Sequence, residues 1–199
     1  MRKWKSRRVP PEIKVGMVVV AYKRPQPLSC LLYSLLSQTH GNFEALVIHD
    51  GPGPEVREVV TRIDDPRIRL TETDVRRGQY GHPLREKGLQ LCSGDYLGTT
   101  NDDNYYAPVY FEWMLHQLLR DEAQFAYCNF VRSHRQWQAY STKPEKSKLD
   151  CGAWLAQAEL VKSTPWTDFS HTGDGTFIEA MVARAEGLTK VEGYLFVHN

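Results

Sequence analysis

Residues 15–21 read Val-Gly-Met-Val-Val-Val-Ala, a nearly continuous apolar run rich in β-branched side chains. Such a run is typical of a strand that is buried on both faces of a sheet. After Pro25, leucines recur at helical spacing and form one apolar stripe, at Leu28, Leu31, Leu32, Leu35 and Leu36. This order predicts a buried strand followed by a helix that packs on the sheet.

The same alternation continues along the chain. Residues 43–48 form a second apolar run, and a short helix over 54–63 and a third strand over 68–70 follow. Alternating strands and helices indicate a parallel sheet with right-handed crossovers. Later patterns predict helices over 83–92, 111–119 and 177–185, strands over 96–100, 125–131 and 191–197, and a loop or an excursion from the sheet over 132–148. We therefore expect an α/β fold, a single domain with a mostly parallel central sheet flanked by helices.

Composition limits the partners of the chain. Its 199 residues suffice for one domain with a substantial core. Because 25 Lys and Arg residues balance 24 Asp and Glu residues, the net charge predicts no nucleic-acid partner. The four cysteines lack the spacing of a metal finger or a redox motif, which indicates buried, reduced thiols.

Residues 1–13 form a basic tail, in which the cations surround Trp4 at Arg2, Lys3, Lys5, Arg7 and Arg8. Such a tail suits peripheral contact with anionic lipid, although a frayed, solvated terminus explains it as well. The chain has no apolar run long enough to span a bilayer, and its basic start is not followed by the apolar segment of a signal peptide. We expect a cytoplasmic protein, with the inner face of the membrane as the alternative location, and we leave a homodimer open.

An acidic turn, Asn101-Asp102-Asp103-Asn104, follows the strand predicted over 96–100. Adjacent carboxylates repel each other, and a divalent cation with oxygen ligands, Mn²⁺ or Mg²⁺, would compensate for this repulsion. A solvated Asn/Asp turn is the alternative. Because ligands of parallel sheets bind at the carboxyl ends of the strands, we expect this turn to share one rim with Tyr22 and Asp50, which end two other strands.

Four blocks in this order resemble a family 2 glycosyltransferase with the GT-A (Rossmann-like) fold. They are Val18-Val19-Val20-Ala21-Tyr22-Lys23-Arg24-Pro25, Ile48-His49-Asp50-Gly51-Pro52, the segment from Leu84 through Tyr96, and the acidic turn in place of the family's Asp-x-Asp motif. The resemblance runs from about Lys14 to His198. Departures from the family pattern are Ala21, Lys23, His49, Glu86, Asn101 and Gly173.

The resemblance implies two halves, a nucleotide-binding half over about 14–104 and a half for acceptor and sugar over about 105–199. It places nucleotide-binding residues at Val20, Ala21, Tyr22, Arg24, Asp50, Arg85 and Asp102, and sugar-binding residues at Asp150, Cys151 and Gly152. Asp50 would contact the base, and Arg85 would lie near the diphosphate. Asp103 would ligate the metal directly with Asp102 as its helper, and His198 would be a further ligand, although a solvated histidine is the alternative there.

The implied activity is metal-dependent transfer of a sugar from a UDP-, GDP- or dTDP-sugar to a hydroxyl of a glycan, lipid-linked or small-molecule acceptor. Asp174 matches the family's catalytic base, which predicts an inverting mechanism. The alternative role for Asp174 is that of a helix N-cap. If it is only a cap, a retaining mechanism remains open. A nucleotide-sugar-binding protein with weak or no turnover is the second possibility. A sugar-1-phosphate nucleotidyltransferase is disfavoured, because no glycine-rich phosphate loop follows the first strand.

Overall fold

A computed structural model describes residues 9–199 of the chain. The cations of the predicted basic tail, from Arg2 to Arg8, lie outside the described residues. None of the helices found within residues 9–199 combines the length and the apolarity that crossing a bilayer requires.

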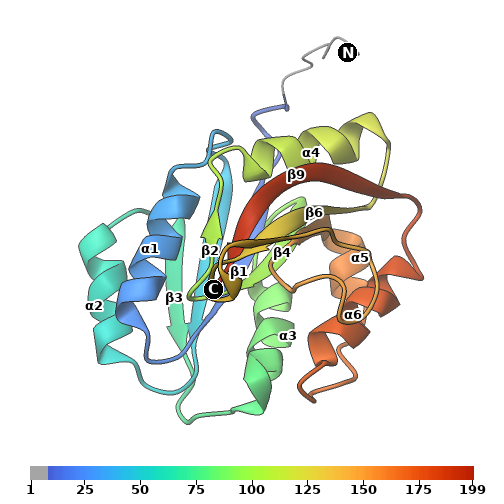
Figure 1. Ribbon diagram of the computed structural model, residues 1–199. Coiled ribbons are helices and arrows are strands. Elements are labelled where there is room, and N and C mark those ends of the chain that lie inside the picture. The colour runs from blue at the N-terminus through green and yellow to red at the C-terminus, as the bar shows by residue number, and fades with distance from the viewer. Residues whose placement is uncertain (1–8) are drawn as a thin grey trace.

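The first half of the chain folds as predicted into alternating strands and helices (Figure 1). Proline at the first turn suits both opening helices, because its fixed φ angle is helical and its missing N–H has no partner there. All seven residues of the first strand are buried. The elements are β1 (Val15–Ala21), α1 (Pro25–Leu36), β2 (Phe43–His49), α2 (Pro54–Ile63), β3 (Ile68–Glu72), η1 (Gln79–Gly81), α3 (His82–Leu91) and β4 (Tyr96–Asn101).

The second half adds three α-helices and five strands, which range in length from 2 to 11 residues. Its elements are β5 (Tyr105–Tyr106), α4 (Tyr110–Arg120), β6 (Phe125–Arg132), η2 (Ser133–Arg135), β7 (Gln138–Tyr140), β8 (Trp154–Gln157), α5 (Ala158–Ser163), α6 (Gly173–Val182) and β9 (Leu188–His198). Residues 132–148 contain the predicted excursion, because β7 pairs only with β6 and lies off the main path of the sheet.

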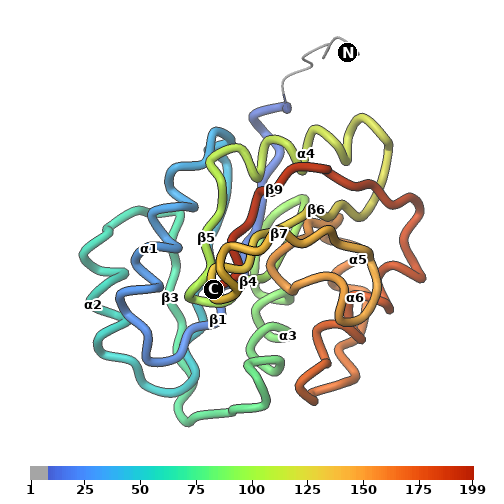
Figure 2. The backbone as a smooth tube through the Cα atoms, in the orientation of Figure 1, coloured from blue at the N-terminus to red at the C-terminus, as the bar shows by residue number. Residues whose placement is uncertain are grey.

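The strands form one sheet in the order β3-β2-β1-β4-β8-β6-β9-β5. The strands from β3 through β4 are parallel, as predicted, whereas β8 is antiparallel to both β4 and β6 and makes the rest of the sheet mixed. β9 returns to run parallel to β6, so that the C-terminal residues lie beside the acidic turn, with Asn199 N donating to Asn104 Oδ1 at 3.4 Å (Figure 2).

The helix predicted over 177–185 instead begins at Gly173 and ends at Val182. Glycine is a poor helix former, so the local pattern around Gly173 and Gly175 gives no sign of this start. Tertiary packing explains it, because a Cβ at position 173 would lie 2.1 Å from the backbone oxygen of Asp168. Only glycine allows the helix to begin this close to the preceding loop.

Candidate active site

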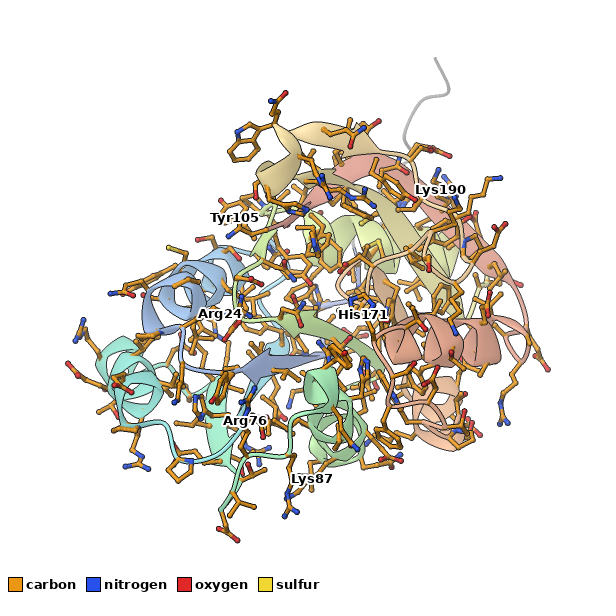
Figure 3. All side chains as sticks on the ribbon, turned by 60° about the horizontal axis from the view of Figure 1, so that its bottom comes forward. Arg24, Arg76, Lys87, Tyr105, His171 and Lys190 are labelled. Atoms are coloured by element: carbon orange, nitrogen blue, oxygen red, sulfur yellow. The ribbon has the colours of Figure 1, made fainter. Side chains whose placement is uncertain are left out.

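A cavity of about 820 Å³ opens where the parallel strands end. The carboxyl ends of β1, β2 and β4 contribute Ala21, Asp50 and Asn101, as expected for a ligand site of a parallel sheet. The predicted rim is therefore confirmed. Figure 3 shows Arg24, Arg76 and His171, which also line the cavity, extending from three different parts of the chain around the ends of β1 and β4.

Most of the residues predicted for the site line this one cavity. These are Val20, Ala21, Tyr22, Arg24, Asp50, Arg85, Asp150, Cys151, Asp174 and His198. Asp102, Asp103 and Gly152 do not belong to this lining. Asp102 and Gly152 are buried, whereas the Asp103 side chain is 13% exposed. The Gly152 carbonyl accepts hydrogen bonds from the hydroxyls of Tyr106 and Tyr110 at 2.8 and 3.2 Å, so the structure gives this glycine a packing role and no contact with the cavity.

Asp50 anchors the loop that follows β3. Its carboxylate accepts hydrogen bonds from the backbone N–H groups of Arg77 and Gly78 at 2.5 and 2.9 Å, while Arg76 Nε lies 3.9 Å away. The Arg76 guanidinium covers the Tyr22 ring at 4.3 Å from its centroid. This end of the cavity thus combines a carboxylate, an aromatic face and a cation, which are suited to a flat, polar ring such as a nucleobase.

Arg24 compensates the charge of the acidic turn. Its guanidinium forms an ion pair with Asp102 at 2.6 Å and a second one with Asp103. Asp102 is fully buried and accepts a hydrogen bond from Tyr22 N at 2.8 Å, so the solvated-turn alternative is wrong for this residue. Burial raises the pKa of Asp102, and the two donors oppose this effect. Asp103 keeps 13% of its side chain exposed and is the more accessible carboxylate.

Arg85 is a buried cation that forms no ion pair with any carboxylate of residues 9–199. It is 3% exposed, and its guanidinium donates to the Tyr80 carbonyl at 2.7 Å, to the Asn101 side-chain oxygen and to Cys151 Sγ at 3.9 Å. Its Nε finds no hydrogen-bond acceptor within the described part of the chain. An uncompensated buried charge is costly, so a site of this kind favours an anionic ligand.

His82 supports Arg85 and was not predicted as a site residue. Its Nε2 lies 3.0 Å from the Ser170 carbonyl, and its Nδ1 lies 3.3 Å from Arg85 Nη1. Burial lowers the pKa of His82 to about 4, and the neighbouring Arg85 adds to this effect. The neutral ring can donate to Ser170 and accept from Arg85 at once. The spacing of three residues between His82 and Arg85 on a helix was the only sequence signal of this contact.

Asp174 lies in the first turn of α6 and faces the cavity. The N-cap position belongs to Thr172, so the alternative of Asp174 as the N-cap is not observed. Its Oδ1 accepts from Gly175 N at 2.9 Å, and burial raises its pKa despite the opposing effect of Arg85. A carboxylate with a raised pKa in a cavity is suited to accept a proton from a ligand.

Asp150 and His198 form a pair in the cavity wall, with Oδ2 and Nδ1 2.9 Å apart. The contact that the His198 imidazole makes with the Asp150 carboxylate raises the pKa of His198. Burial alone would raise the pKa of Asp150, but His198, the Gly152 N–H and the charge of Arg85 together lower it. His198 is therefore not a solvated terminal histidine. Cys151 is buried beside them, and burial raises the pKa of its thiol well above the ordinary value.

Within residues 9–199, no group of three His, Cys, Asp or Glu side chains is already arranged around a metal position. The donors present still fit Mn²⁺ or Mg²⁺, because such ions often bind one or two carboxylates and take their remaining ligands from substrate phosphates and water. Asp103 lies close enough to His198 to raise the pKa of its imidazole, which brings the two predicted ligands into one neighbourhood.

The model of glycosyl transferase family 2 matches residues 17–182. The chain belongs to this family. The match covers the four sequence blocks and every residue that lines the cavity except His198, so the resemblance noted from the motifs is confirmed.

Family 2 relatives include two Escherichia coli enzymes named UDP-Glc:alpha-D-GlcNAc-diphosphoundecaprenol beta-1,3-glucosyltransferase. WfaP is 23% identical over 152 residues, which cover 75% of this chain and 59% of WfaP. WfgD is 26% identical over 116 residues, which cover 58% of this chain and 45% of WfgD. This chain thus spans about half the length of these relatives.

Two solved structures share the fold. S. aureus TarS 1–349 in complex with UDP superposes with a TM-score of 0.81 at 12% identity, over 94% of this chain and 60% of TarS 1–349. The second is the mannosyltransferase PcManGT from Pyrobaculum calidifontis in complex with GDP-Man and Mn²⁺. It superposes with a TM-score of 0.72 at 15% identity, over 99% of this chain and 60% of the PcManGT chain. The GT-A expectation for the fold is therefore confirmed.

Proposed function

We propose that this protein transfers a sugar from a nucleotide-diphospho-sugar to an acceptor hydroxyl, with Asp174 as the general base and inversion at the anomeric carbon. The observation that carries the proposal is the buried Arg85, which forms no ion pair within the described residues, in the same cavity as a carboxylate with a raised pKa. A departing diphosphate needs positive charge, and an attacking hydroxyl needs a proton acceptor. The cavity offers both.

Donor binding follows the order of the strands. Asp50 and Tyr22 would hold the base, Val20 and Ala21 would hold the adjoining part of the nucleotide, and Arg85 would bind the diphosphate. Asp102 would support them from behind, through its hydrogen bond with Tyr22 N. The structures of TarS in complex with UDP and of PcManGT in complex with GDP-Man support a nucleotide ligand, although they do not select the base.

A divalent cation fits the open part of the acidic turn. Asp103 and His198 would hold it, and it would supply further charge neutralisation for the diphosphate when bound. Arg24 pairs with both carboxylates of the turn and so offsets the charge that the cation would otherwise neutralise. The Mn²⁺ in the PcManGT complex supports a divalent ion of this type.

Asp174 would take the proton of the acceptor hydroxyl. Its burial disfavours the charged form, which makes the carboxylate a better proton acceptor than an ordinary aspartate. His82 keeps the Arg85 guanidinium in place and stays neutral, so it does not compete for the diphosphate. The sugar would lie beside Asp150 and Cys151, which line the space near Arg85.

Binding and turnover can be tested separately. Thermal shift and calorimetry with UDP, GDP and dTDP, each with and without Mn²⁺, should show tight binding of one diphosphate that strengthens with the metal. Release of that nucleoside diphosphate from its sugar conjugate, with or without an added sugar acceptor, then reports turnover. Binding without any release would favour the nucleotide-sugar-binding alternative. Absence of binding by all three would overturn the proposed function.

A further inference from the structure

One wall of the cavity is basic. It consists of Arg132, His134, Arg135 and Lys148, which come from the end of β6, from η2 and from the segment before β8, and we call it the basic wall. All four residues line the cavity. Among residues 130–149 no aspartate or glutamate lines it, since Glu145 lies outside the lining. Asp150, the next lining residue along the chain, is paired with His198, so the four residues of the wall themselves carry charge of one sign only.

Within residues 9–199 the cations of the basic wall have no carboxylate partners, unlike Arg24 and Arg76 in the same cavity. Arg24 pairs with the acidic turn and Arg76 lies 3.9 Å from Asp50. Within the described residues 9–199, Arg132, Arg135 and Lys148 form no ion pair. Unpaired cations gathered in a concave surface attract an anion and raise its local concentration.

Aromatic side chains hold Arg132 in a position that leaves its donors available. Its guanidinium lies 4.1 Å from the centroid of the Tyr140 ring and 5.6 Å from that of Phe130. Both rings also line the cavity. An arginine stacked on ring faces keeps its in-plane N–H groups free, and their fork matches two oxygens of a phosphate.

The basic wall lies at the end of the cavity away from Asp50. In the sheet order, β1, β4 and β8 separate β2, which ends near Asp50, from β6, which ends at Arg132. Arg132 is in register with His198, and the His134 ring lies 5.2 Å from the His198 ring. The wall thus begins beyond the residues proposed for the cation and the diphosphate of the donor, where an acceptor would enter.

We infer that the basic wall binds a phosphate group carried by the acceptor substrate. This inference rests on the proposed function and adds the chemical class of its second substrate. Two arginines, one lysine and a histidine around one concave patch match a group with more than one negative charge, which a phosphate ester supplies. The acceptor would thus lie with its phosphate against the wall and its hydroxyl toward Asp174.

The test uses phenyl phosphate as the probe and protein saturated with the nucleoside diphosphate it prefers. Calorimetry should detect binding of phenyl phosphate to this loaded protein. The variant Arg132→Gln/Arg135→Gln/Lys148→Gln should bind the probe at least about tenfold more weakly, because each lost charge-assisted hydrogen bond contributes measurably. Its affinity for the nucleoside diphosphate should change by less than about twofold. Arg135→Gln alone should give a smaller loss in the same direction, and it serves if the triple variant does not fold.

The matched control is Arg62→Gln/Lys87→Gln/Lys143→Gln, which removes three positive charges outside the cavity lining. These side chains are exposed, and Lys143 belongs to the same excursion as the wall. The control should bind phenyl phosphate like the unmodified protein. An equal loss in the control would mean that only net charge matters and would overturn the inference.

Two further outcomes would also overturn it. If phenyl phosphate competes with the nucleoside diphosphate, or if the triple variant loses affinity for the diphosphate itself, the wall serves the donor. If the wall instead supports binding to phosphatidylglycerol vesicles while phenyl phosphate does not bind, its ligand is a membrane surface. In each case the proposed function still stands if the unmodified protein binds the nucleoside diphosphate. Failure of the inference can therefore be told apart from failure of the proposed function.

Discussion

The Arg85 guanidinium donates a hydrogen bond to the side-chain oxygen of Asn101, so that a buried cation is paired with a neutral amide. Asn101 occupies the position where the Asp-x-Asp motif of the family begins. An aspartate here would form an ion pair with Arg85 and neutralise it. The asparagine instead satisfies one donor of the guanidinium and leaves its charge for a ligand.

We therefore expect Asn101→Asp to weaken binding of the preferred nucleoside diphosphate by about tenfold, because the new carboxylate would both neutralise Arg85 and repel the phosphates. Calorimetry in the absence of metal measures this effect directly. Asn101→Ala, which removes the hydrogen bond without adding charge, should weaken binding less. Equal or tighter binding by the aspartate variant would contradict the role assigned to Asn101.

Asp174→Asn should lower sugar transfer by at least about a hundredfold, because the amide cannot accept the proton of the acceptor hydroxyl. The dissociation constant of the donor should stay within about threefold, since this residue is not proposed to bind the nucleotide. Transfer rates and donor calorimetry are measured on the same preparation. If transfer and donor binding fall together, Asp174 binds the donor and is not the general base.

Asp103→Ala should abolish the strengthening of nucleotide binding by Mn²⁺. Asp103 is the more exposed carboxylate of the acidic turn and has His198 nearby, whereas Asp102 is engaged with the Tyr22 backbone. Calorimetry with and without Mn²⁺ gives the difference, and Asp64→Ala, which alters an exposed helix-end carboxylate elsewhere, serves as the control. A metal effect that survives in Asp103→Ala would show that the cation has other ligands.

Acid should destabilise the fold partly through His82. Its pKa is lowered to about 4 from an ordinary value of 6.5, so between these pH values the unfolded chain binds a proton that the folded chain does not. The free energy of unfolding should therefore fall as the pH drops from about 6.5 to 4, by up to about 3 kcal/mol from this residue. Urea unfolding at several pH values should show a weaker pH dependence for His82→Gln. Identical pH dependence in both proteins would contradict the assignment.

Gly88→Ala should destabilise the protein by about 1–3 kcal/mol through overpacking. A Cβ at this position would lie 2.5 Å from Val18 Cγ1 and 2.7 Å from Ile48 Cδ1, because α3 packs closely on β1 and β2. The gain in helix propensity, about 1 kcal/mol, acts in the opposite direction and is the smaller effect in a rigid core. Urea unfolding measures the change, with the exposed Glu86→Ala as control. A stabilised Gly88→Ala would mean that the core readily expands.

Local patterns in the sequence were sufficient for most of the elements. The bounds of α2 agree with those predicted, because Pro54 marks its start and Asp64, with a φ of 49°, ends it in a left-handed conformation. The same alternation placed the ends of β1, β2 and β4 on one rim. It did not anticipate the start of α6, where a glycine is required by close contact with the preceding loop at Asp168 rather than by helix periodicity.

The sequence by itself thus determined the α/β class, the family and the rim on which the site residues gather, because periodicity and motif order are local properties. Only the tertiary structure decided the partners of these residues. It paired Arg24 with the acidic turn, Asp150 with His198 and Asn101 with Arg85, and it turned Gly152 into the core. These contacts join residues far apart in the chain, and their charges and burial depend on packing that no local pattern specifies.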